Sequence, residues 1–145
     1  NTTQTVSNIA AVYTVTMANT FANLGVYVTG TNQIHFSANG VYKVTYDLQF
    51  YNTDNNQQDI TVWFRKNGID IPNSASIVSV PNKHGGIKGH FILALNLVEQ
   101  FSAGDYVELY WTGDDTDLSI ETLPAGVAPV YPQVPSVIIT ATKVS

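Results

Sequence analysis

The chain has 145 residues, of which 44% are hydrophobic and 12% are charged, about half the charged share of an ordinary soluble domain. This length suits one domain, and the wealth of apolar and aromatic residues excludes intrinsic disorder. The net charge of −5 argues against a nucleic-acid-binding surface, and the lack of cysteine excludes disulfides and thiolate-bound metals. No apolar run approaches the roughly 18 to 20 residues that span a bilayer.

Short strand candidates come first along the chain, at residues 11–17, 26–29 and 33–36. Residues 41–50 give the clearest strand, because apolar and polar side chains alternate strictly along them. This period of two places one set of side chains on a single face of a sheet. The apolar set is Tyr42, Val44, Tyr46, Leu48 and Phe50.

Residues 60–66 alternate in the same way and end at Asn67-Gly68. This dipeptide suits a two-residue type I′ turn, because both of its positions need a positive φ. Residues 69–71 then run back until Pro72 stops them. The pattern therefore predicts a β-hairpin over residues 60–71.

Further strands are predicted at residues 77–80, 86–98, 106–111, 118–122 and 136–144. The Leu-rich run at 91–100 would also suit a helix, but the alternation and the preceding glycines favour a strand. The Pro-rich residues 124–135 predict an extended, polyproline-like surface connection without strands. Nine or ten short strands without a convincing helix indicate an all-β sandwich or barrel.

Few residues suggest chemistry. Asp114, Asp115 and Asp117 could wrap a calcium ion, although the EF-hand spacing is missing and a solvated turn explains them equally well. A glycosidase needs two carboxyls in one cleft, and Glu99, Glu108 and Glu121 more readily form ion pairs on strands. We therefore expect no catalytic residue, no enzyme activity and no resident metal.

Residues 106–111 are unusual because both faces of this strand carry large side chains. Val107, Leu109 and Trp111 form one face, while Tyr106 and Tyr110 flank Glu108 on the other. Tyrosine at such positions is typical of protein–protein interfaces, although the rings could instead cover one another on an exposed sheet. Residues 91–98 are also apolar on both faces, which indicates either a sandwich corner or a partner subunit, and we favour the partner.

Several motifs follow one another in a familiar order: Phe36 with Gly40-x-Tyr42, the Asn67-Gly68 turn, the apolar strand at 91–98 and Gly104-Asp105-x-Val107-x-Leu109. This order resembles the C1q/TNF-like jelly roll. The likeness is closer still to a jelly-roll family of bacteriophage virion proteins. It is carried by residues 62–72, Asn96, 104–111 and 135–140, and it extends over residues 26–144.

The resemblance implies an all-β, two-sheet jelly roll at residues 26–145 that assembles as a homotrimer, with residues 1–25 as an anchor or first strand. One sheet would face the three-fold axis and contain the strands at 41–50, 106–111 and 136–144. We expect a contact between Lys43 and Glu108 there. The expected interface comprises Tyr106, Glu108, Tyr110, Lys43, Thr45 and Asp47.

Two functions fit this picture. The first is a non-enzymatic virion structural protein, located outside cells on a tail fibre, head fibre or capsid surface, which binds other virion proteins and a host surface glycan or protein. Its contact loops would be 52–59, 82–89 and 112–117, with Asn55, Asn56, Lys83, His84, Asp114 and Asp115 exposed. The alternative is a free-standing carbohydrate-binding or cell-surface adhesion module. Trp63 would then be an exposed platform, although packing within its hairpin is the simpler expectation.

Overall fold

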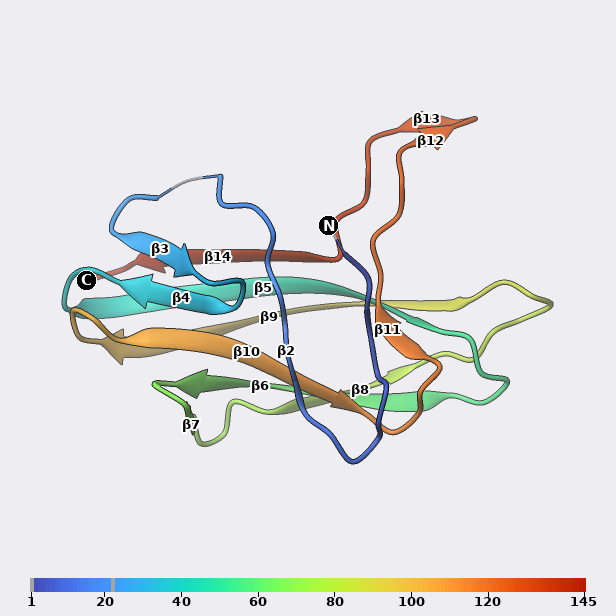
Figure 1. Cartoon of the computed structure of the whole chain (residues 1–145), viewed down its shortest axis with the longest axis horizontal. Coiled ribbons are helices and arrows are strands. Elements are labelled where there is room, and N and C mark those ends of the chain that lie inside the picture. The colour runs from blue at the N-terminus through green and yellow to red at the C-terminus, as the bar shows by residue number, and fades with distance from the viewer. Residues whose placement is uncertain (1, 22) are drawn as a thin grey trace.

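The computed structural model describes residues 2–21 and 23–145, and within them it contains strands and turns but no helix. Two antiparallel sheets pack into a sandwich, and a small separate hairpin projects from it (Figure 1). The prediction of an all-β fold is confirmed. The strand predicted at residues 86–98 is confirmed over the helical alternative for residues 91–100, because β9 (Gly89–Phe101) pairs along its whole length, although it begins three residues later than predicted.

β5 (Gly40–Asn52) is the middle strand of the five-stranded sheet. β9 follows one edge of β5 from end to end. The other edge is shared by β14 (Val137–Lys143) and β11 (Leu118–Ile120), and β1 (Gln4–Thr5) extends the sheet beyond β11. The edge of β14 that points away from β5 has no strand partner among the described residues.

β10 (Tyr106–Gly113) is central in the seven-stranded sheet. It pairs with β6 (Gln58–Lys66) on one edge, and with β4 (Gln33–Phe36) and β2 (Tyr13–Thr14) on the other. β3 (Val26–Thr29) pairs with β4, while β7 (Ile69–Asp70) and β8 (Ser76–Val80) both pair with β6. The predicted hairpin is confirmed, since φ is 51° at Asn67 and 81° at Gly68.

The core lies between the two sheets and uses the alternating side chains that the sequence indicates. All five apolar residues of β5 are buried, and they meet Val107, Leu109 and Trp111 of β10. At one end the rings of Phe36 and Phe101 stack with centroids 3.9 Å apart. The N-terminal segment contributes to the same core, because Val6 and Val15 are fully buried beside β1 and β2.

Two sequence-based predictions are wrong. β10 does not share a sheet with β5 and β14, because it pairs with β6, β4 and β2 on the opposite side of the sandwich. An alternating pattern defines the inward face of a strand but not the sheet to which the strand belongs. Residues 124–135 are also not a simple polyproline path, because β12 (Gly126–Val127) pairs with β13 (Val130–Tyr131). The prolines lie outside these two short strands, so they do not interrupt the pairing.

Candidate functional site

The outer face of the five-stranded sheet is the first candidate surface. Its side chains lie in rows across three strands: Val98–Lys43–Thr142, Asn96–Thr45–Thr140 and Ala94–Asp47–Ile138, with Ile92 beside Gln49. Ile92 and Ile138 remain 62% and 51% exposed. We call these side chains of β5, β9 and β14 the outer sheet face. The side chains of its middle strand are polar, whereas the flanking strands carry both apolar and polar side chains.

The outer face of β10 lies on the opposite side of the molecule and is covered by its own neighbours. Tyr110 packs on Trp63, with ring centroids 5.9 Å apart, and the guanidinium carbon of Arg65 lies 3.9 Å from the Tyr110 centroid. The His35 ring lies between Tyr106 and Tyr27, at 5.2 and 5.4 Å. Tyr106 and Tyr110 are therefore covered by side chains of other strands rather than by each other, which neither of the two expectations for this face described.

The six residues expected at a trimer interface consequently do not form one surface. Lys43, Thr45 and Asp47 belong to the outer sheet face, whereas Tyr106, Glu108 and Tyr110 lie on the other sheet. The expected contact between Lys43 and Glu108 is wrong. The buried carboxylate of Glu108 instead accepts a hydrogen bond from Asn32 Nδ2 at 2.7 Å.

A patch of four side chains forms around Trp63, which is half-buried and points outward from β6. Trp63 Nε1 donates a hydrogen bond to Asp70 Oδ1 at 2.7 Å, and Arg65 Nε donates to the same oxygen at 2.5 Å. Both hydrogen bonds lower the pKa of the Asp70 carboxyl, and the one from Arg65 has the larger effect. We call Trp63, Arg65, Asp70 and Tyr110 the aromatic–arginine patch.

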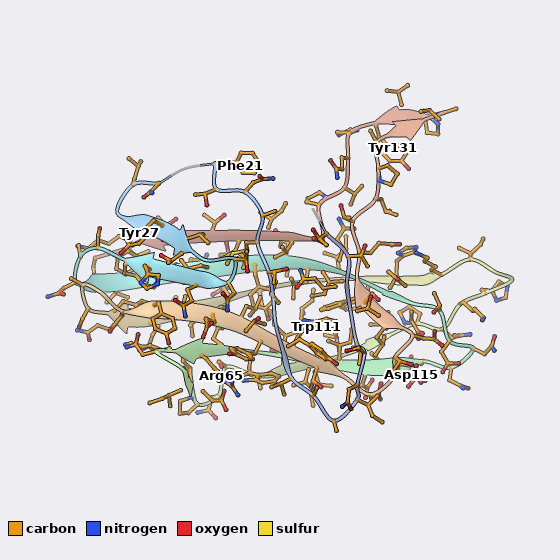
Figure 2. All side chains as sticks on the ribbon, in the orientation of Figure 1. Phe21, Tyr27, Arg65, Trp111, Asp115 and Tyr131 are labelled. Carbon is orange, nitrogen blue, oxygen red and sulfur yellow. The ribbon has the colours of Figure 1, made fainter. Side chains whose placement is uncertain are left out.

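The three predicted contact loops do meet at one end of the sandwich. Lys83 N donates to Asp54 O at 2.9 Å, Asp59 N donates to Asp114 Oδ1 at 2.9 Å, and the Thr53 hydroxyl donates to Asp117 Oδ1 at 2.7 Å. Figure 2 shows Asp115 at this end. Asn55, Asn56, His84 and Asp114 are exposed, while Lys83 and Asp115 are half-buried.

The aspartates of this end act as turn-forming acceptors. Asp115 Oδ1 accepts the Asp117 N–H at 2.8 Å, and the Gln58 side chain is the first cause of the lowered pKa of Asp54. Within residues 2–21 and 23–145, no three His, Asp or Glu side chains are placed to hold a metal ion. The hydrogen bonds account for the acidic residues as loop structure.

The three glutamates are widely separated and each has a partner of its own. Lys66 Nζ lies 3.5 Å from Glu99, and Asn32 binds Glu108. Glu121 is buried, where it pairs with Lys88 and with His90 Nδ1 at 3.4 Å. Sequence reasoning missed this last cluster, because 33 residues separate Lys88 from Glu121.

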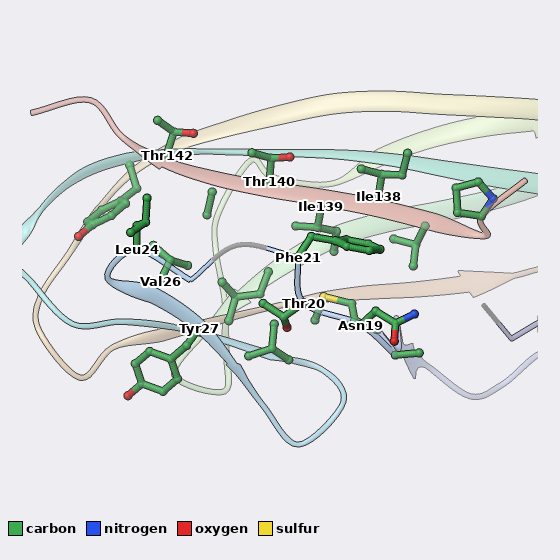
Figure 3. Close-up of a pocket in the computed structure, with 18 of the residues that line it drawn as sticks. Asn19, Thr20, Phe21, Leu24, Val26, Tyr27, Ile138, Ile139, Thr140 and Thr142 are labelled. Carbon is green, nitrogen blue, oxygen red and sulfur yellow. The ribbon is translucent and has the colours of Figure 1, made fainter.

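A cavity of about 960 Å³ opens between β3 and β14, on the side of the sandwich where each sheet ends in an unpaired strand edge. Figure 3 shows Phe21 beside Ile139, with Leu24 and Val26 nearby. We call it the apolar cleft, and it was not predicted. Its main apolar walls are Met17, Val26, Val28, Ile34, Val137, Ile139 and Ala141.

The chain matches no protein-family model, and no curated protein is significantly similar to it. The described residues also contain no helix that is long and apolar enough to cross a membrane. Function therefore has to be argued from the surfaces themselves.

Proposed function

We propose that this chain is a non-enzymatic structural domain that assembles as a homotrimer through the outer sheet face, as a component of a bacteriophage virion surface. The observation that carries the proposal is the exposure of Ile92 and Ile138 on a long, regular sheet that no other part of the described chain covers. Ile92 and Ile138 flank the polar middle strand, and exposed apolar side chains set among polar ones are typical of protein–protein interfaces.

The strand pairing supports a jelly roll. β4–β10, β5–β9 and β6–β8 are nested antiparallel pairs, and successive pairs alternate between the two sheets. A long hairpin rolled around a core produces this arrangement, as in double-sheet jelly rolls. The motifs that resemble phage virion proteins fall mainly on β6, β9, β10 and β14, which is why we place the domain on a fibre or capsid.

The mixed chemistry of the outer sheet face suits a specific contact between copies. Ala94, Val98 and Ile138 supply apolar area, while Lys43 and Asp47 lie four residues apart on the same face of the middle strand. Charges arranged like this add little affinity but disfavour shifted registers. A three-fold axis would bring this face of each copy against its neighbours.

The test is the mass of the purified chain in solution, measured by analytical ultracentrifugation. We expect a trimer, and we expect Ile92→Asp to weaken it at least about tenfold, because a carboxylate would have to be buried. Ile77→Asp is the matched control, since Ile77 is equally exposed but lies on β8 of the other sheet. A monomeric wild type, or a trimer that tolerates Ile92→Asp, would refute the proposal.

A second candidate function is carbohydrate binding at the aromatic–arginine patch. Its half-exposed aromatic rings lie beside Arg65 and Asp70, so it offers both a stacking surface and hydrogen-bonding groups. Titration on a glycan array tests it: binding that Trp63→Ala removes supports a lectin-like module. If the wild type binds no glycan on the array, this second function is wrong and the structural function is left.

A further inference from the structure

The hairpin formed by residues 122–135, between β11 and β14, projects from the side of the sandwich as an arm (Figure 1). Within the described residues, β12 pairs only with β13 and with neither main sheet. Val127 and Val130 near its tip are 89% and 86% exposed. No charged residue occurs between residues 122 and 135. An extended apolar arm of this kind exposes surface that favours burial.

The apolar cleft also exposes apolar side chains, because no segment of the described chain fills it. Phe21 and Leu24 at its mouth are 98% and 96% exposed although they line an apolar cavity (Figure 3). Residues 136–143 all line the cleft. The side chains of β14 therefore face the opening, and so does its outer backbone edge, which has no strand partner among the described residues. A cleft with a free strand edge accepts an extended segment, which supplies backbone hydrogen bonds and apolar side chains together.

The distribution of charge favours another copy of this chain as the occupant. Two copies that each carry −5 repel one another, so they associate best through surfaces without carboxylates. The lining of the cleft contains no Asp or Glu, and Lys143 is its one charged residue among those described. The uncharged arm and this lining can therefore meet without burying an unpaired acid.

We propose that the arm of one copy inserts its Val127 and Val130 tip into the apolar cleft of the neighbouring copy. Gln133 and Pro135 at the base of the arm line the cleft of their own chain, but the tip of the arm points away from its own sandwich (Figure 1), so a contact between tip and cleft joins different patches on two molecules. Such heterologous contacts close into rings when the rotation permits. The inference rests on the proposed trimer and names a second contact within it.

The decisive test is a pair of cysteines in a chain that has none of its own. Val130→Cys combined with Phe21→Cys should form disulfides between copies, which appear as covalent dimers and trimers on a non-reducing gel. Each single variant should give no trimers. If the double variant forms only a disulfide within one chain, or no disulfide while the protein remains trimeric, the proposed contact is wrong.

Ultracentrifugation adds an independent measurement. Val130→Asp and Phe21→Asp should each weaken trimerisation at least about tenfold, and both positions are too exposed for the change to unfold the chain. Ile87→Asp, at an exposed residue of a different loop, is the control and should have no effect. An unaffected trimer in both variants overturns this inference alone, whereas a monomeric wild type overturns the proposed function as well.

Discussion

Gly89 is the position where one added methyl group should be most damaging. An alanine Cβ there would lie 1.8 Å from the carbonyl oxygen of Pro81 and 2.6 Å from its carbonyl carbon. Carbon and oxygen atoms approach no closer than about 3.3 Å even in weak hydrogen bonds. Both groups belong to the main chain, so the connection between β8 and β9 would have to move. We expect Gly89→Ala to cost about 3 kcal/mol, the upper end of overpacking penalties.

Thermal unfolding followed by circular dichroism measures this cost. A loss of about 3 kcal/mol lowers the Tm of a chain of this size by roughly 6–12 °C. Gly85→Ala is the control in the same loop, because no atom lies within 4 Å of its added Cβ. Its φ of +57° leaves a penalty of about 1 kcal/mol, or about 2–4 °C. Equal melting temperatures for the two variants would show that Pro81 and Gly89 do not approach so closely.

Three further predictions concern the core and the aromatic–arginine patch. Burial raises the pKa of Tyr46 to about 12 from the usual 10.0 of a tyrosine, so its phenol ionises at a lower pH in the unfolded chain than in the folded one. Between pH 10 and 12 the wild type should therefore lose up to about 2.7 kcal/mol of unfolding free energy relative to Tyr46→Phe, and parallel pH curves would contradict this. Val15→Ala should lower the free energy of unfolding, measured by urea denaturation, by about 2 kcal/mol, because Val15 is buried. Val12→Ala should lower it by almost nothing, because Val12 is exposed. Equal losses in the two variants would show that the N-terminal segment does not contribute to the core. Arg65→Met should change stability by less than about 1 kcal/mol, since its partner Asp70 is largely exposed, and a larger loss would assign the patch a structural role.

The candidate surfaces were only partly visible in the sequence. Apolar residues on both faces of residues 91–98 favoured a partner subunit, and Ile92 on the outer sheet face is exposed in the single chain. The same argument applied to Tyr106 and Tyr110 failed, because Trp63, Arg65 and His35 come from other strands to pack on them. The residues that neighbour Glu108 and Glu121 in the sequence did not indicate which side chains bind these two carboxylates.

The sequence alone determined the local features of this protein. Period-two alternation set which side chains of β5 are buried, and Asn67-Gly68 set a hairpin turn, because a strand has two faces and few residues adopt a positive φ. Only the tertiary structure decided that β10 lies opposite β5 and that β3 and β14 leave a cleft between them. Alternating strands are nearly interchangeable as neighbours, so their pairing depends on how the whole core fills, which no local pattern records.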